Sequence, residues 1–405
     1  MKSIAVIGAG TMGAGIAQLA AGHGSSVRLI DVDNDKLDRS MAGITKRVER
    51  MVEKGSIERG AGNALLAKIR TRGEMTDLGD VELVVEAVVE NLEVKREVFA
   101  RLEAATTASA VLATNTSSLS ITDIAAKLND PSRVVGMHFF NPAPVMDLVE
   151  IIAGEKSGRR SIDVAFDAAK SWDKTPVRAK DTPGFIVNRV ARGFYLEGLR
   201  LLDEGVAGVD EIDGIMRAHG KFRMGPFELM DLVGIDVNFA VSTSVWERMG
   251  KPARLTPHEI QGRLVEQGHL GRKSKRGFYT YAHDAPMPAV VVDRRSFQLS
   301  PLLSDVMLAF SARAGAITAG STEQYVFCRI LGAVINEAGL AYSDGVASSD
   351  DIDTAMIKGT NYPRGPLAWS DEIGHRTVRG LLKALNGTVS DGRYESAPLF
   401  RDALD

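Results

Sequence analysis

The first half of the chain alternates short apolar runs with segments of helical pattern. Runs rich in Val and Ile occupy residues 3–7, 26–30, 81–85, 110–114, 133–139 and 148–152. Runs of this length suit strands, and the apolar residues between them recur at helical spacing. The alternation predicts an α/β domain over residues 1–180, with a doubly wound sheet of the Rossmann type.

A long charged segment separates the second run from the third. Its apolar positions follow helical spacing, and they are Leu37, Met41, Ile44, Val48 and Met51. We therefore expect a helix pair over residues 34–68, inserted into the α/β domain. The outer face of this pair carries Lys46, Arg47, Arg50 and Lys54. A charged helical face is usually only solvated, and ligand binding is the alternative.

Helical patterns fill the chain beyond the turn sequence at residues 181–185. Residues 186–204 are predicted to form one long helix that ends at Gly205. The sequence from residue 205 onward is repeated in part 140 residues later. The matched pairs are Gly205 with Gly345, Asp210 with Asp350, Ile212 with Ile352, Asp213 with Asp353, Met216 with Met356, Gly225 with Gly365, Asp231 with Asp371 and Gly234 with Gly374.

The repeat predicts two copies of one all-α domain, at residues 181–282 and 321–405. Residues 283–320 between them have no clear period and form a connector of undefined structure, and the tail after residue 386 is predicted to be loop-like. The position equivalent to Asn188 in the second copy is Cys328. We therefore expect one active copy followed by one structural copy.

Composition fits a protein with two or three domains. The chain has 405 residues, a hydrophobic fraction of 44% and a formal net charge of -3, so nothing favours a nucleic-acid partner. Cys328 is the single cysteine and excludes an intrachain disulfide, and no apolar run is long enough to span a membrane. The first strand begins at once, without a leader, and we expect a cytoplasmic protein.

A glycine-rich turn follows the first predicted strand. In this G-x-G-x-x-G pattern, the glycines allow a tight turn, close approach of a pyrophosphate, and close packing of helix on strand. The turn residues predicted to bind the cofactor are Gly8, Gly10, Thr11, Met12 and Gly13. Asp31 ends the second strand, where an acid can bond both ribose hydroxyls of NAD and would repel the 2′-phosphate of NADP. We therefore expect NAD.

Five motifs in order carry a family resemblance. They are the glycine turn at 8–13, Glu86-Ala-Val-Val-Glu90 with Lys95, Asn115-Thr-Ser117, His138-Phe-Phe-Asn141, and the segment from Asp181 to Asn188. Residues 1–282 resemble the L-3-hydroxyacyl-CoA dehydrogenases, including the 3-hydroxybutyryl-CoA type. The second helical copy extends the likeness in the manner of the dehydrogenase part of fatty-oxidation multifunctional enzymes.

His138 is the predicted general base. Oxidation of a secondary alcohol needs a base for the hydroxyl proton, and neutral histidine suits this near neutral pH. His138 closes the run at 134–138, at a strand's carboxyl end, where ligands gather in open α/β sheets. Glu150, on the next strand, could accept from its second ring nitrogen and fix the tautomer. An isolated histidine here would more often be a packed core residue.

Ser117 and Asn188 are expected around the reacting oxygen. Ser117 follows the strand at 110–114, and Asn188 begins the long helix. Both could donate hydrogen bonds to the substrate oxygen, although turn formation or helix capping is an equally common role for a Ser or Asn.

The resemblance implies further contacts for the ligands. It assigns Asp31, Glu90, Lys95, Ser117 and Asn141 to NAD, and Ser117 and Asn188 to the substrate. Lys54 would meet the phosphate-rich end of coenzyme A, with Arg47 where relatives can carry a small hydroxyl residue. No metal is expected. A homo-oligomer is possible, but the second helical copy could replace the domain of a dimer partner.

The expected function is NAD-dependent, reversible oxidation of (S)-3-hydroxyacyl-CoA to 3-oxoacyl-CoA. Fatty-acid, butanoate and aromatic-degradation pathways are all compatible. The alternatives are a dehydrogenase of a free 3-hydroxy acid or sugar acid, and a non-catalytic NAD-binding protein.

Overall fold

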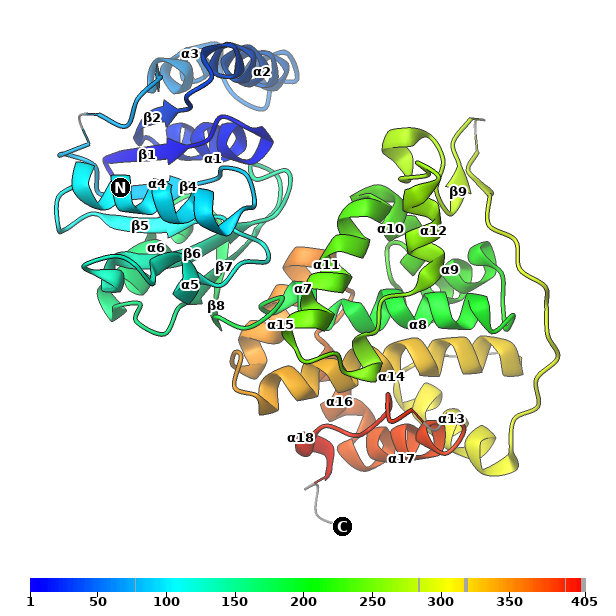
Figure 1. The fold of residues 1–405 in the computed structure, drawn as a ribbon. Coiled ribbons are helices and arrows are strands. Elements are labelled where there is room, and N and C mark those ends of the chain that lie inside the picture. Colours follow the sequence, from blue (N-terminus) through cyan, green and yellow to red (C-terminus); the bar gives the residue numbers. More distant parts are fainter. Residues whose placement is uncertain (77, 283–284, 317–319, 390, 402–405) are drawn as a thin grey trace. The chain divides into compact units, whose positions relative to one another are not determined.

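The chain forms two compact units, Met1–Phe185 and Ile186–Asp405 (Figure 1). The computed structural model describes residues 1–76, 78–282, 285–316, 320–389 and 391–401. Residues 283, 284 and 317–319 of the expected connector lie outside the described residues. Within these described ranges, no helix is long and apolar enough to cross a membrane.

The first unit is built on one eight-stranded sheet. Its strands are β1 (Ser3–Ile7), β2 (Ser26–Ile30), β3 (Ile69–Arg72), β4 (Leu83–Glu86), β5 (Val111–Thr114), β6 (Val134–Phe139), β7 (Leu148–Ala153) and β8 (Thr175–Lys180). They lie in the order β3-β2-β1-β4-β5-β6-β7-β8. Strands β1 to β6 are parallel, β7 is antiparallel to β6, and β8 is parallel to β7.

The predicted α/β sheet is confirmed, with two strands that the prediction missed. All six predicted runs form strands, but β3 and β8 were not expected. Both lie at the edges of the sheet. β3 has one buried residue, and β8 contains Pro176 and alternates apolar with charged side chains. Edge strands need no continuous apolar run and tolerate proline.

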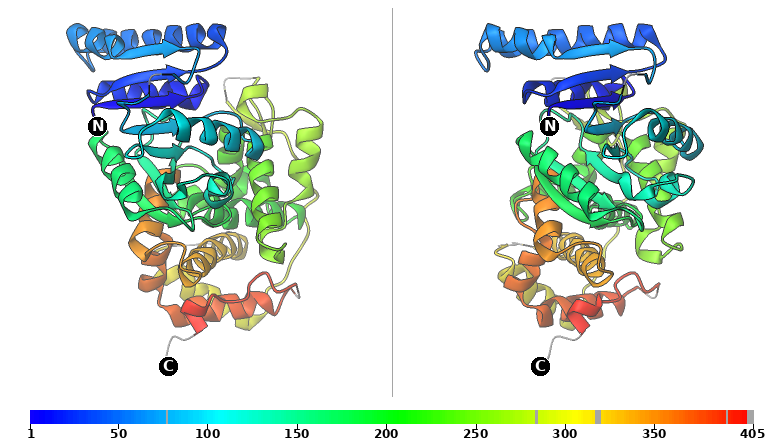
Figure 2. Two further views of the ribbon diagram at one scale, coloured as in Figure 1. Left: turned by 60° about the vertical axis from the view of Figure 1, so that its left-hand side comes forward. Right: turned by 90° about the vertical axis from the view of Figure 1, so that its left-hand side faces the viewer.

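The expected helix pair is also present. Helices α2 (Asn34–Glu53) and α3 (Arg59–Ala67) follow β2 (Figure 2). Helix α2 buries Leu37, Ile44 and Val48. The Asp33 carboxylate accepts from the Lys36 amide and caps α2. The remaining helices of the unit are α1 (Thr11–Gly22), α4 (Leu92–Ala105), α5 (Ile121–Ala125) and α6 (Arg159–Ser171), with a 3₁₀ turn, η1 (Pro131–Arg133).

The second unit is helical, apart from the short strands β9 (Tyr279–Thr280) and β10 (Met287–Pro288). Its helices are α7 (Val187–Val190), α8 (Arg192–Asp203), α9 (Val209–Ala218), α10 (Pro226–Val233), α11 (Ile235–Arg248), α12 (Glu259–Glu266), α13 (Pro301–Arg313), α14 (Ser321–Ser343), α15 (Ser349–Thr360), α16 (Pro366–Ile373), α17 (His375–Asn386) and α18 (Pro398–Arg401), with 3₁₀ turns η2 (Ala253–Leu255) and η3 (Arg272–Ser274). The long helix predicted over 186–204 is interrupted by a turn at Ala191. The connector contains α13, whose Leu303, Met307 and Phe310 are buried.

The 140-residue offset recurs in the helices. Helices α10 and α16 begin and end at positions 140 residues apart, and the carboxylate of an aspartate on the preceding helix caps the start of each one. Asp213 accepts from the amides of Phe227 and Glu228 at 3.0 and 2.9 Å. Asp353 accepts from Leu367 and Ala368, both at 2.8 Å. The repeated sequence therefore encodes the same helix start twice.

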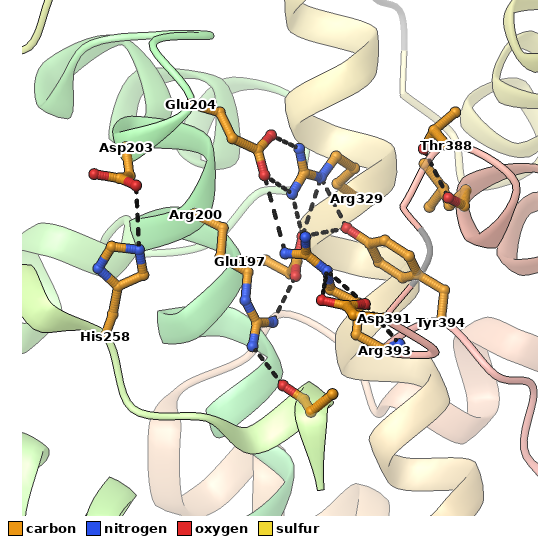
Figure 3. Close-up of polar contacts among 12 residues, drawn as sticks. Glu197, Arg200, Asp203, Glu204, His258, Arg329, Thr388, Asp391, Arg393 and Tyr394 are labelled. Atoms are coloured by element: carbon orange, nitrogen blue, oxygen red, sulfur yellow. Dashed lines mark hydrogen bonds and ion pairs between the residues drawn. The ribbon is translucent and has the colours of Figure 1, made fainter.

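Buried ion pairs join α7 and α8 to α14 in a reciprocal pattern. Arg189 donates to Glu337 at 2.8 Å and to Asp344 at 2.6 Å. The residues 140 positions away exchange roles, because Arg329 binds Glu197 at 3.0 Å and also Glu204 (Figure 3). In such an isologous contact, residue i meets j and the equivalent of j meets the equivalent of i.

The tail completes the same ion-pair network. The Tyr394 hydroxyl donates to Glu197 at 2.6 Å (Figure 3), and Arg254, 140 residues earlier, donates to Glu337 at 2.7 Å. Burial alone would raise the pKa of Glu197, but Arg329, Arg200 and Tyr394 lower it to about 2. Glu197 therefore stays ionised inside the protein.

Gly193 lies where the two repeats approach most closely. A Cβ on Gly193 would come within 2.9 Å of the backbone of Ala333, the residue at the equivalent position. An element that contacts its own equivalent marks the axis of a two-fold arrangement.

We predict that Gly193→Ala lowers the free energy of unfolding by about 1 to 3 kcal/mol, because helix α14 must shift to admit a methyl group. Urea unfolding of the full chain measures this change in the free energy of unfolding. Gly214→Ala in α9 is the matched control, since its Cβ would meet no atom within 4 Å, and it should raise stability by up to about 1 kcal/mol. Equal effects of the two changes would contradict the close approach.

Candidate active site

The glycine turn between β1 and α1 is held by its own close packing. Gly8 has φ of 101°, and a Cβ there would lie 2.6 Å from the Ala87 oxygen. A Cβ on Gly13 would overlap the Gly8 oxygen at 1.8 Å. Gly10 differs, because a Cβ there would meet nothing within 4 Å. Two glycines are thus fixed by protein contacts, and Gly10 borders open space.

This turn suits the pyrophosphate of a dinucleotide. Gly10 is the N-cap of α1 and provides no side-chain cap, so the first amides of α1 remain available to an anion. Thr11 and Met12 begin the helix. Asp31 ends β2 beside the turn and accepts from the Ala9 amide at 2.7 Å and from Lys36 at 2.7 Å. Burial alone would raise the pKa of Asp31, but Lys36 and the backbone amides lower it. Asp31 is therefore a carboxylate.

His138 and Glu150 face each other across strands β6 and β7. The two residues are direct partners in the antiparallel register, and Nδ1 of His138 lies 2.6 Å from Oε2 of Glu150. Glu150 is fully buried and His138 is 6% exposed. The rings of Phe140 and Phe185 pack on the imidazole, at centroid distances of 4.5 and 6.0 Å. The imidazole is thus held on one side by a carboxylate and by aromatic rings.

Glu90 organises the loop that carries Ser117. Its Oε1 accepts from the Thr116 hydroxyl at 2.6 Å and from the Ser117 and Ser118 amides at 3.0 and 3.1 Å. Burial by itself would raise the pKa of Glu90, but Lys95 and these donors lower it. The lowered pKa favours the ionised form of Glu90, whose Oε1 accepts from the donors of the loop.

Glu86 is a buried site residue that the sequence analysis did not select. It ends β4, is fully buried, and accepts from Lys95 at 2.7 Å and from Thr114 at 2.7 Å. Lys95 is 1% exposed and also lies 3.3 Å from Glu90. One feature of the sequence could have identified Glu86, namely its position at a strand end, four residues before Glu90.

Asn115 is a second residue that the sequence analysis did not select. Its Oδ1 accepts from the Phe139 amide at 2.8 Å and so connects the ends of β5 and β6. Asn141 follows β6 and precedes Pro142 through a cis peptide bond. His138, Ser117, Glu90 and Asn141 thus follow or end neighbouring strands of the sheet.

Lys54 is not joined to this group by the described contacts, and Asn188 belongs to the other unit of the chain. Lys54 is exposed at the end of α2, and within the described ranges no hydrogen bond or ion pair connects it to the other predicted site residues. Arg47, on the same helix, donates to Gln18 at 2.6 Å. Asn188 lies on α7 in the second unit, so its position beside the substrate remains a prediction. Across the described residues, no cluster of His, Cys, Asp and Glu could hold a metal.

The sheet topology and the glycine turn define a dinucleotide-binding protein of the Rossmann type. Comparison with known families gives the particular group. Residues 3–182 match the model of the 3-hydroxyacyl-CoA dehydrogenase NAD binding domain, and residues 184–281 and 325–405 both match that of the 3-hydroxyacyl-CoA dehydrogenase C-terminal domain. The chain belongs to the 3-hydroxyacyl-CoA dehydrogenase family.

Individual relatives agree in family but differ in the acyl group they are named for. The chain is 37% identical to 3-hydroxyadipyl-CoA dehydrogenase of Escherichia coli K12, over 99% of this chain and 97% of the relative. It is 38% identical to 3-hydroxybutyryl-CoA dehydrogenase of Clostridioides difficile, over 69% of this chain and 99% of the relative. A crystal structure of 3-hydroxybutyryl-CoA dehydrogenase from E. coli K12 superposes with a TM-score of 0.87 and 36% identity, covering 99% and 97% of the two chains.

We predict that Glu90→Gln lowers kcat/KM about 10- to 100-fold, because the amide must turn its NH₂ group toward either Lys95 or the loop donors and so displaces Ser117. Steady-state NADH formation measures this. Glu93→Gln, in the first turn of α4 just after Glu90, is the control, since Glu93 is exposed and bonds Arg96, and it should leave the kinetics unchanged. An unaffected Glu90→Gln enzyme would mean that the loop does not depend on this carboxylate.

Proposed function

We propose that this chain oxidises (S)-3-hydroxyacyl-CoA thioesters to 3-oxoacyl-CoA reversibly, with NAD as the acceptor and His138 as the general base. The observation that carries the assignment of the base is the 2.6 Å contact between Nδ1 of His138 and Glu150, at the end of β6 in the unit that bears the glycine turn. The names of the relatives support the thioester as substrate.

His138 accepts the hydroxyl proton through Nε2. Its Nδ1 donates to Glu150, which fixes the tautomer and leaves Nε2 basic. When the proton arrives, the buried carboxylate stabilises the imidazolium. Bound NAD supplies the acceptor for the hydride that leaves carbon 3. In the reverse direction, the imidazolium returns the proton to the carbonyl oxygen.

Ser117 and Asn188 polarise the reacting oxygen in this proposal. Ser117 is supported by its place on the loop that Glu90 holds, and it would donate to the substrate oxygen. Asn188 would donate from the helical unit. Glu90, Lys95 and Asn141 would border the nicotinamide end of NAD, and Asp31 its adenine ribose. Lys54 and Arg47 would supply positive charge to the coenzyme A phosphates.

The division into domains and the oligomeric state also stay proposals. We propose an NAD domain at 1–180, an active helical copy at 181–282, and a structural copy at 321–405. The reciprocal ion pairs support a second copy that occupies the surface a partner chain would otherwise cover. The full-length chain should then sediment with the mass of one chain, and a stable two-chain species would argue against this. A cytoplasmic location remains a prediction from the sequence.

The decisive test is NADH formation from (S)-3-hydroxybutyryl-CoA and from free 3-hydroxybutyrate. We expect turnover of the thioester and little of the free acid. Because the base is removed, His138→Gln should lower kcat/KM about 10²- to 10⁴-fold while NAD affinity changes less than about twofold.

The contrary results separate the alternatives. Preference for the free acid would support a hydroxy-acid dehydrogenase. Tight NAD binding without turnover of either compound would support a non-catalytic NAD-binding protein. A fully active His138→Gln enzyme would remove His138 from the mechanism and leave the substrate assignment in place.

A further inference from the structure

One buried arginine of the helical unit lacks an acidic partner. Arg192 begins α8 and is 3% exposed. The other two buried arginines described in this unit, Arg189 and Arg329, each bind two carboxylates. For Arg192, the part of the chain that the structure describes provides no ion pair. Its guanidinium lies 4.8 Å from the centroid of the Tyr195 ring. A buried guanidinium with only neutral groups around it is costly to a fold, so its retention calls for a reason.

The hydrogen bonds of Arg192 are one-sided. Nη1 donates to the Asn238 carbonyl at 3.1 Å, to Asn238 Oδ1 at 3.4 Å and to the Ser242 hydroxyl at 2.7 Å. Nε is buried and has no hydrogen-bond partner among the described residues. Burial lowers the pKa of Arg192, and the nearby groups that oppose this shift are the hydroxyls of Tyr195 and Tyr362 rather than carboxylates. The neutral partners hold the guanidinium in place without neutralising it.

The second helical copy serves as an internal control. Positions 140 residues beyond Asn188 and Arg192 hold Cys328 and Gly332, and those beyond Asn238 and Ser242 hold Val378 and Leu382. All four are buried. The same helical framework therefore packs with an apolar interior at this place, so folding does not require the polar group. The polar set occurs in the copy that also carries Asn188.

The position of Arg192 relates it to the substrate. Arg192 follows Asn188 by four residues, across the turn at Ala191 that separates α7 from α8. Helix α11, which bears Asn238 and Ser242, is in contact with α7. Exposed apolar side chains stand on α10 and the start of α11, namely Leu232, Val233 and Val237. These apolar side chains suit the methylene groups of an acyl chain. Arg192 suits an anionic group at the end of a short acyl chain.

Resting on the proposed function, we infer that Arg192 binds the terminal carboxylate of the acyl chain, so that the preferred substrate is a short dicarboxylyl-CoA. The carboxylate accepts from Nε on the side of the guanidinium that the protein leaves unbonded. Asn238 and Ser242 are positioning residues that orient Nη1. A chain ending in a methyl group leaves the buried charge without its partner.

The experiment compares (S)-3-hydroxyadipyl-CoA with (S)-3-hydroxyhexanoyl-CoA, which have the same number of acyl carbons and differ in the terminal group. The wild-type enzyme should prefer the dicarboxylyl thioester at least about tenfold in kcat/KM. Arg192→Met should lower kcat/KM for that substrate about 100-fold and change it less than about threefold for the hexanoyl compound. Arg192→Lys keeps the charge and loses the planar fork of the guanidinium. Its kcat/KM for the dicarboxylyl substrate should lie between the values of the wild-type and Arg192→Met enzymes.

The ratio of kcat/KM for the two substrates, measured on one preparation, does not depend on the fraction of inactive protein. A partly unfolded variant can therefore still be compared with the wild-type enzyme. Arg217→Met is the matched control, because it removes an exposed arginine that pairs with Glu228, and it should leave the ratio unchanged. A wild-type ratio of one or less, or an Arg192→Met enzyme with the wild-type ratio, overturns the inference. Failure of both thioesters with the wild-type enzyme would instead overturn the proposed function.

Discussion

A charge that leaves water must meet a partner, and this constraint organises the interior of both units. In the first unit, Lys95 lies between Glu86 and Glu90, so the ammonium group compensates one fully buried carboxylate and one that binds the Ser117 loop. In the second unit, Arg189 and Arg329 cross between the repeats. The ion pairs fix which elements lie together, because a shift of either partner would leave a charge unpaired in a medium of low polarity.

The two helical copies separate the requirements of packing from those of the site. The interface between them has charged residues at equivalent positions of the two copies. Arg189 is equivalent to Arg329, and Glu197 is equivalent to Glu337. The set around Arg192 is not kept, and apolar residues replace it in the second copy. The interface charges are therefore kept in both copies, whereas the polar group around Arg192 occurs in the first copy alone.

The fold was largely predictable from the sequence because continuous apolar runs report buried parallel strands. The six central runs form buried strands, five of them parallel to one another and β7 antiparallel to β6, whereas β3 and β8 lie at the edges and have too few apolar residues to stand out. The antiparallel direction of β7 was not predictable either, since a strand's pattern carries no sign of its orientation. The repeat was visible because each helix start needs the same residues at the same spacing. Asp213 accepts from the first amides of α10, and a Cβ on Gly225 would overlap Asp213.

Parts of the candidate site were predictable from the sequence because their chemistry needs a rare residue type or motif. Other parts were not predictable, because they use common charged residues whose role depends on their position in the fold. The glycine turn and His138 stand out in the sequence, while Glu86 and Arg192 are ordinary charged residues until their burial is known. Several of the 49 basic residues are buried and paired. Only three-dimensional contacts distinguish a guanidinium compensated by carboxylates from one held by an amide, a carbonyl and a hydroxyl.

The reversal of β7 is what allows His138 and Glu150 to work as one unit. Direct partners in an antiparallel pair project to the same face of the sheet, so twelve residues of sequence separation become a single hydrogen bond. Had β7 continued the parallel direction, its connection would have needed a crossover, and the carboxylate would not lie opposite the ring. Because Glu150 is fully buried, water does not compete for it. The carboxylate therefore holds Nδ1 at 2.6 Å, and in the proposed mechanism this leaves Nε2 as the nitrogen that meets the substrate.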